Sequence, residues 1–151
     1  MSKFLNASLS ALQPYIPGEQ PCGREYIKLN TNESPYFPSK YAVEKIDFSE
    51  LENLRLYSDP ECLKLSEAIA HFYNVSENNV LPTNGSDEAL AFCFLAFCER
   101  GAVFPDITYG FYKVFANLFG VGYKEVPLKP DFTVDTAVFA NCGKTVFLAN
   151  P

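Results

Sequence analysis

The sequence predicts an α/β protein with a mostly parallel sheet flanked by helices, preceded by an extended N-terminal arm. Short apolar runs alternate with helical patterns from about residue 60 onward, which is typical of such a sheet. Proline and glycine recur through residues 14–38 and exclude long helices there. The chain has 151 residues, of which 48% are hydrophobic and 15% aromatic, enough for one packed domain. We therefore divide it into residues 1–60, the arm and an extended segment, and residues 61–151, an α/β region.

Residues 24–60 are expected to be mostly extended, after a short helix and an irregular arm. A short helix is predicted over residues 3–12, ending before Pro14. Residues 26–30 are predicted to form a strand, and Pro35 and Pro38 argue against a long helix after it.

The second region gives an alternating series of strands and helices. The expected elements are helices over 62–73, 89–95 and 109–119, and strands over 80–83, 101–104, 122–128 and 144–148. In the third helix the apolar face is predicted to comprise Phe111, Val114, Phe115 and Leu118. Ligands of parallel sheets bind at the carboxyl ends of strands, which directs attention to residues 83–87, 105–109 and 148–151.

The turn between the strand over 80–83 and the next helix is the most informative segment. Its sequence is Asn84-Gly85-Ser86-Asp87-Glu88, where glycine tolerates positive φ and Ser86 or Asp87 can cap the helix. Backbone N–H groups at a helix start, together with the helix dipole, form a seat for a phosphate group. An ordinary capped helix without a ligand explains the same residues equally simply.

Composition excludes several other classes of function. A net charge of −6 and a pI near 4.8 argue against a nucleic-acid partner. Five scattered cysteines and one histidine fit neither a zinc site nor a disulfide framework, and they indicate reduced thiols in the cytoplasm. The N-terminus lacks a signal-peptide pattern, and no segment has the length of a membrane span. The usual dinucleotide and P-loop glycine motifs are also absent.

Five motifs occur in order along the chain: Leu12-x-Pro14-Tyr15-x-Pro17-Gly18, Lys28-Leu29-Asn30-Thr31-Asn32-Glu33-Ser34-Pro35, Arg55-Leu56-Tyr57-Ser58-Asp59-Pro60, Asn84-Gly85-Ser86-Asp87-Glu88, and Thr108-Tyr109-Gly110-Phe111-Tyr112. Their order and spacing resemble the N-terminal part of the histidinol-phosphate aminotransferases. These are pyridoxal-phosphate enzymes of the aspartate-aminotransferase fold. The resemblance covers essentially all 151 residues, which is less than half of a complete family member. Asn150-Pro151 resembles the start of the family's Asn-Pro-x-x-Pro-Thr-Gly loop, so we expect a truncated domain.

The resemblance implies a binding site for pyridoxal phosphate. Gly85, Ser86 and Asp87 would hold its phosphate, largely through backbone N–H groups, and Tyr109 would lie against its pyridine ring. Tyr57 would reach the cofactor phosphate of a neighbouring subunit, which implies a homodimer. Without a cofactor, Tyr109 is an aromatic residue at a helix start and Tyr57 an exposed turn residue.

The same resemblance places the substrate near the N-terminal arm. Tyr15, Asn32 and Glu33 are the candidate substrate-binding residues, although Glu33 has an equal claim to be a surface turn residue before Pro35. The sequence departs from the family pattern at Ser34, where Asn is commoner. It also departs at residues 106–107, where the usual proline before Thr-Tyr is missing.

The expected activity is transamination between histidinol phosphate and 2-oxoglutarate in histidine biosynthesis. The family's Schiff-base lysine belongs beyond Pro151, so residues 1–151 contain no predicted catalytic residue and are expected to be inactive alone. Aromatic amino acid aminotransferases and related pyridoxal-phosphate decarboxylases share these N-terminal signals and stay open as alternatives. A phospho-ligand-binding α/β module without covalent chemistry and a fragment that only dimerises are the non-enzyme alternatives. No metal site is expected.

Overall fold

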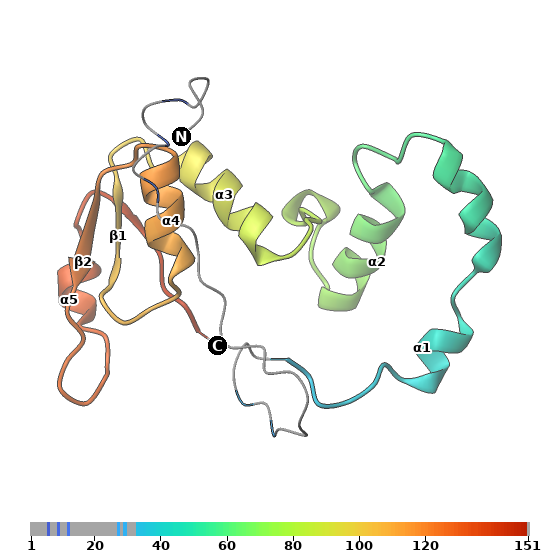
Figure 1. The fold of residues 1–151 in the computed structure, drawn as a ribbon, viewed down its shortest axis with the longest axis horizontal. Helices are drawn as coiled ribbons and strands as arrows, with labels where there is room; N and C mark the ends of the chain where they lie inside the picture. The colour runs from blue at the N-terminus through green and yellow to red at the C-terminus, as the bar shows by residue number, and fades with distance from the viewer. Residues whose placement is uncertain are drawn as a thin grey trace. The chain divides into compact units, whose positions relative to one another are not determined.

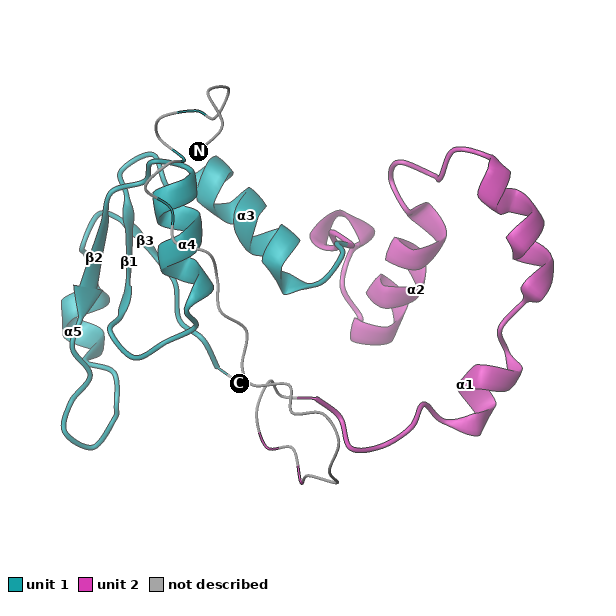
Figure 2. Cartoon of the chain, in the orientation of Figure 1, with its two compact units in different colours: residues 1–15, 83–151 teal, residues 16–82 magenta. Residues whose placement is uncertain are grey.

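The computed structural model describes residues 33–150 together with residues 6, 9, 12, 27 and 29. The chain forms two compact units, one comprising residues 1–15 and 83–151 and the other residues 16–82 (Figure 2). The predicted helix over 3–12 and strand over 26–30 lie mostly outside the described residues. The division of the chain by role at residue 60 stays a prediction.

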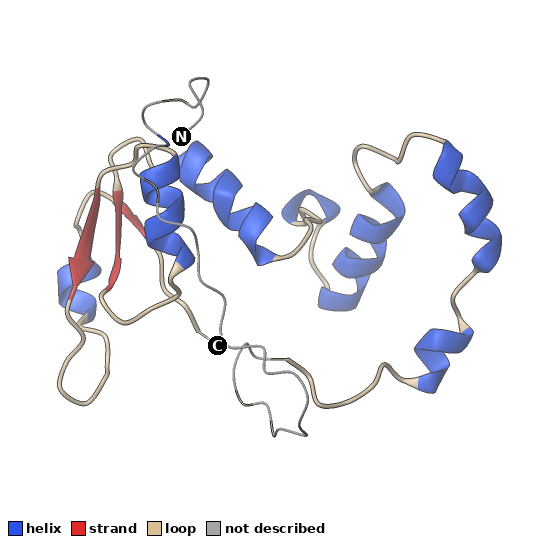
Figure 3. Ribbon diagram, in the orientation of Figure 1, coloured by secondary structure: helices blue, strands red, loops and turns tan. Residues whose placement is uncertain are grey.

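The unit of residues 16–82 is helical in its described part (Figure 3). Its elements are α1 (Lys40–Glu44), η2 (Phe48–Arg55), α2 (Leu63–Tyr73) and η3 (Glu77–Asn79). The helix predicted over 62–73 is confirmed by α2. The prediction of a mostly extended chain up to residue 60 is wrong over α1 and η2.

Local capping explains these two short helices. The Ser39 hydroxyl accepts a hydrogen bond from the Ala42 N–H at 3.1 Å, and the Asp47 carboxylate accepts one from the Ser49 N–H at 2.9 Å. Between Pro38 and Pro60 there is no proline to interrupt the helical turns. Sequence reasoning extended the effect of the flanking prolines too far into this stretch.

The unit that contains residues 83–151 is built on a three-stranded parallel sheet (Figure 1). Its strands are β1 (Ala102–Pro105), β2 (Tyr123–Val126) and β3 (Thr145–Val146), in the spatial order β2-β1-β3. Ala102 lies opposite Tyr123 on one side and Thr145 on the other. The predicted α/β class with a parallel sheet is confirmed, although β2 and β3 are shorter than predicted.

Helices cover both faces of this sheet because successive strand residues point to opposite sides. On one face Ala102 and Phe104 pack with residues of α3 (Ser86–Phe97) and α4 (Phe111–Leu118). On the other face Val103 packs with Val126 of β2 and with Phe139 of α5 (Thr136–Phe139). The sheet thus has α3 and α4 on one side and α5 on the other.

Three details differ from the sequence prediction. Residues 80–83 form no strand: Val80 is extended, but Pro82 lacks an N–H donor for a ladder. The four-residue α5, capped by Asp135, was not predicted because it is shorter than a detectable helical period. The buried residues of α4 are Tyr112, Phe115 and Ala116, so of the predicted apolar face Phe115 alone is fully buried.

Among the described residues, no helix combines the length and apolar character needed to cross a membrane.

Candidate functional site

Gly85 sets the geometry of the turn that starts α3. Its backbone has φ +80° and ψ 173°, a conformation that residues with a side chain rarely adopt. The Gly85 N–H donates to the Thr83 carbonyl and the Thr83 hydroxyl donates to the Gly85 carbonyl, each at 2.9 Å. A Cβ atom at Gly85 would have no neighbour within 4 Å, so the conformation rather than crowding requires glycine.

The N-terminus of α3 begins at Gly85 without a side-chain cap. The prediction that Ser86 or Asp87 caps the helix is wrong, because Ser86 is already the first helical residue. Glu88 instead reaches back, and its carboxylate accepts a hydrogen bond of 2.7 Å from the Asn84 N–H. The helix start therefore presents backbone N–H groups beside open space at Gly85, an arrangement that suits an anion.

Tyr109 lies beside this helix start. Its hydroxyl donates a hydrogen bond to the Asp87 carboxylate at 2.7 Å, although 22 residues separate the two in sequence. Tyr109 is 37% exposed. Its ring stacks on Phe111 at a centroid distance of 5.6 Å and meets Tyr112 edge-on at 5.8 Å. The structure thus brings together the predicted phosphate-binding turn and the predicted stacking residue.

The loop between β1 and α4 carries Tyr109 and is connected to the neighbouring strand by Asp106. The Asp106 Oδ1 atom accepts hydrogen bonds from the N–H groups of Ile107 at 2.9 Å and Leu128 at 3.0 Å. Sequence reasoning did not assign a role to Asp106. The signal available was an aspartate directly after a predicted buried strand, because such a side chain often binds nearby backbone N–H groups.

Two groups close to this loop have altered acid–base properties. Burial raises the pKa of the Tyr112 phenol, which keeps this core tyrosine neutral over the physiological range. The Lys113 ammonium lies 2.6 Å from the Glu125 carboxylate, and the hydrogen bond to Glu125 raises the pKa of Lys113. This ion pair connects α4 to β2.

The remaining predicted site residues all precede the Gly85 turn in the sequence. Tyr57 is fully exposed in the loop that follows η2, and Glu33 is exposed as well. Tyr15 and Asn32 lie outside the described residues. Their predicted contacts with substrate and a partner subunit stay predictions.

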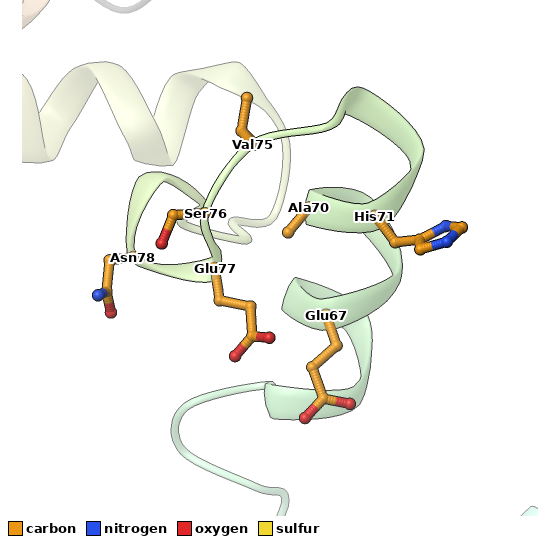
Figure 4. Close-up of a pocket in the computed structure, with 7 residues that line it drawn as sticks. All are labelled: Glu67, Ala70, His71, Val75, Ser76, Glu77 and Asn78. Carbon is orange, nitrogen blue, oxygen red and sulfur yellow. The ribbon is translucent and has the colours of Figure 1, made fainter.

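A separate hollow of about 440 Å³ lies between α2 and η3 (Figure 4). Its lining includes Glu67, Glu77 and the backbone around Val75, whereas the His71 ring points away from its centre. None of the predicted site residues that the structure describes lines it. The described residues also contain no cluster of histidine, cysteine and carboxylate groups that fits a metal ion.

Comparison with known proteins decides the family. Residues 24–145, most of the chain, match the model of the family "Aminotransferase class I and II". The chain belongs to this aminotransferase family. The turn at Gly85 and the Tyr109 loop both lie inside the matched region.

The curated relatives of this aminotransferase chain include two bacterial proteins named histidinol-phosphate aminotransferase. The one from Brachyspira hyodysenteriae is 48% identical over an alignment that covers all of this chain and 43% of the relative. The one from Clostridium acetobutylicum is 47% identical, with 44% of the relative covered. The chain thus spans less than half the length of these relatives.

A solved structure from Erwinia carotovora atroseptica, assigned by its name to the histidinol-phosphate aminotransferases, has a similar fold. The TM-score is 0.58 at 27% sequence identity, over 68% of this chain and 32% of that one. The aminotransferase fold predicted from the sequence is confirmed by this likeness.

Proposed function

We propose that the whole protein is a pyridoxal-phosphate-dependent aminotransferase that acts on histidinol phosphate and 2-oxoglutarate in histidine biosynthesis. The observation that carries the proposal is the hydrogen bond between Tyr109 and Asp87 at the start of α3. It joins a helix N-terminus suited to phosphate with an aromatic ring suited to a flat heterocycle. The names and high identity of the curated relatives favour histidinol phosphate as the substrate.

The residues at this site fit pyridoxal phosphate. The N-terminus of α3 has no side-chain cap, and the space beside Gly85 is open. The backbone N–H groups of Ser86 and Asp87 would bind the phosphate, and the Tyr109 ring would lie against the pyridine. When bound, pyridoxal phosphate supplies an electron sink for chemistry at the amino-acid Cα atom.

The chain's own residues would hold and orient the cofactor. The hydrogen bond to Asp87 holds the tip of the Tyr109 side chain, and the ring contacts with Phe111 and Tyr112 set its plane, so the ring is placed before the cofactor arrives. The half-buried Asp87 carboxylate is held by this bond, while its backbone N–H remains part of the helix start. We place Tyr57 at the cofactor phosphate of a partner subunit in a cytoplasmic homodimer. Tyr15, Asn32 and Glu33 are our candidates for the substrate.

A transamination assay on the complete native protein tests this proposal. With histidinol phosphate and 2-oxoglutarate we expect glutamate formation, and with unphosphorylated histidinol a much lower kcat/KM. Preference for an aromatic amino acid donor would indicate an aromatic aminotransferase. Release of carbon dioxide without glutamate would indicate a decarboxylase.

A cofactor-binding measurement separates these enzymes from the non-enzyme alternative. Wild-type protein is expected to bind pyridoxal phosphate, and Tyr109→Ala is expected to weaken this binding by removing the ring. Tight binding of several phosphate compounds, with no transamination in the complete protein, would support a phospho-ligand-binding module instead.

A further inference from the structure

The loop between β1 and α4 is short, and it places Tyr109 beside the start of α3. Residues 106–110 connect the last residue of β1, Pro105, to the first residue of α4, Phe111. At the start of this loop the Asp106 N–H still donates to the Val126 carbonyl of β2 at 3.0 Å. The backbone of the loop is thus anchored to the sheet at its first residue.

The Asp106 side chain adds a second attachment. Its Oδ1 atom accepts from the Ile107 N–H in the loop itself and from the Leu128 N–H, which follows β2. A single oxygen therefore connects the segments that follow two neighbouring parallel strands. Because the strands are parallel, these segments leave the sheet at the same edge.

The far end of the loop is fixed by Tyr109, whose hydroxyl binds Asp87 on α3. Between the two attachments lie only Ile107 and Thr108. Because only these two residues separate Asp106 from Tyr109, a shift of the backbone at Asp106 is expected to move Tyr109 as well.

We propose that Asp106 is a positioning residue for Tyr109, and that it acts by holding the β1–α4 loop against the segment after β2. The inference rests on the proposed function, because it assigns the Tyr109 ring to the cofactor. The role requires an oxygen acceptor at the Oδ1 position and no negative charge.

A second aspartate of the same unit supplies a matched control. The Asp131 carboxylate also accepts from a backbone N–H, that of Thr133 at 3.1 Å, and from the Thr133 hydroxyl at 2.7 Å. Both bonds stay within one turn, and Tyr109 is on another loop. Asp131→Ala thus removes a comparable carboxylate without loosening the Tyr109 loop.

The experiment compares Asp106→Ala, Asp106→Asn and Asp131→Ala in the complete native protein. Hydrogen exchange at the Leu128 amide reports the attachment, and dissociation constants are measured for pyridoxal phosphate and for inorganic phosphate. In Asp106→Ala we expect faster exchange at Leu128 and about tenfold weaker binding of pyridoxal phosphate. Binding of inorganic phosphate should change by less than about twofold, because phosphate needs only the start of α3.

Asp106→Asn keeps an oxygen acceptor and should stay within about twofold of wild type for both ligands, as should Asp131→Ala. The proposal is overturned if Asp106→Ala exposes the Leu128 amide without weakening pyridoxal phosphate. It is equally overturned if both ligands weaken together, since that pattern indicates general loosening of the fold.

A separate readout applies if the wild-type protein binds no pyridoxal phosphate, an outcome that contradicts the proposed function. Nitration of Tyr109 by tetranitromethane, mapped by mass spectrometry, then reports the placement of the ring. Faster nitration in Asp106→Ala than in Asp131→Ala supports the positioning role. Equal rates in these two variants overturn it.

Discussion

At the scale of single residues, Gly85 has a backbone conformation at the site that other residues rarely adopt. Replacement by alanine leaves enough space but forces a side-chain residue into φ +80°. We expect Gly85→Ala to lower the free energy of unfolding by about 1–3 kcal/mol, measured by urea denaturation. It should also weaken phosphate binding, because the N–H groups at the start of α3 would turn.

Gly110→Ala is the control for this prediction. Gly110 has φ −60° and also has open space at the position of a Cβ atom, so alanine needs no backbone change there. Its effect should lie within about 1 kcal/mol and can be stabilising, because alanine restricts the unfolded chain. Equal destabilisation by both variants would contradict the assigned strain at Gly85.

The bond between Tyr109 and Asp87 can be measured by a double-mutant cycle. Tyr109→Phe removes the hydroxyl and Asp87→Ala removes the carboxylate, and the double variant removes both. Because the two groups bind each other at 2.7 Å, we expect a coupling free energy of about 0.5–1.5 kcal/mol in urea unfolding. Additive effects would show that the two side chains do not interact in solution.

At the scale of elements, α3 depends on one buried aromatic residue. Phe94 is 1% exposed, its ring stacks on Phe147 at 4.3 Å, and Phe115 lies 5.9 Å away. Phe94→Ala should lower the free energy of unfolding by about 3–5 kcal/mol, because a large cavity forms between α3 and the sheet. The neighbouring Leu95 is 62% exposed, so Leu95→Ala should cost less than about 1 kcal/mol.

The hydrogen bonds at the start of α2 predict how the stability of this helix depends on pH. The Asp59 carboxylate accepts hydrogen bonds from the N–H groups of Leu63 at 2.8 Å and Glu61 at 3.0 Å, and these bonds lower the pKa of Asp59. A carboxyl group with a lowered pKa in the folded state stabilises that state above its unfolded pKa, near 3.8. This contribution is lost as pH falls through the lower folded value.

The amide signal of Leu63, followed by NMR from pH 7 to pH 2, reports this loss. In the wild type its chemical shift should change with a midpoint below 3.8, the ordinary value for an aspartate. In Asp59→Asn that transition should disappear, and the stability of the start of α2 should fall less as the pH is lowered. A midpoint at or above the ordinary value would contradict the assigned hydrogen bonds.

Elements with a clear local signal were predictable from the sequence, and those defined by distant partners were not. The apolar periodicity of α2, α3 and α4 reflects burial along one helix, which the sequence displays directly. A strand requires a partner, so residues 80–83 share the composition of a strand but have no strand structure. The burial of Tyr112 and Ala116 depends on the exact rotation of α4 against β1, and periodicity alone does not set that rotation.

The same distinction applies to the candidate site. Gly85 and Tyr109 were identifiable because each belongs to a recognisable motif. The interaction of Tyr109 with Asp87 and the bond from Leu128 to Asp106 each connect residues 22 positions apart. The Leu128–Asp106 bond follows from the parallel pairing of β1 and β2, and the Tyr109–Asp87 bond from the packing of α3 with α4. No local pattern in the sequence specifies either contact.

At the scale of the whole molecule, residues 1–151 are expected to show no transaminase turnover when produced alone. By resemblance, the lysine that would bind the cofactor covalently lies beyond Pro151, and an amine nucleophile is indispensable for this chemistry. Glutamate formation from histidinol phosphate and 2-oxoglutarate is the measurement, with the complete native protein as the positive control. Turnover by residues 1–151 would show that one of the lysines within this chain can serve.

The strand order β2-β1-β3 has a consequence for synthesis on the ribosome. The central strand β1 obtains its first neighbour soon after it emerges, but the second, β3, emerges only after β2 and α5. Until then one edge of β1 is unpaired, and Phe94 lacks the ring of Phe147 on which it stacks. Nascent chains whose emerged part ends before residue 145 should therefore be prone to aggregate and to bind chaperones, whereas emergence of β3 and Phe147 from the ribosome should relieve both tendencies.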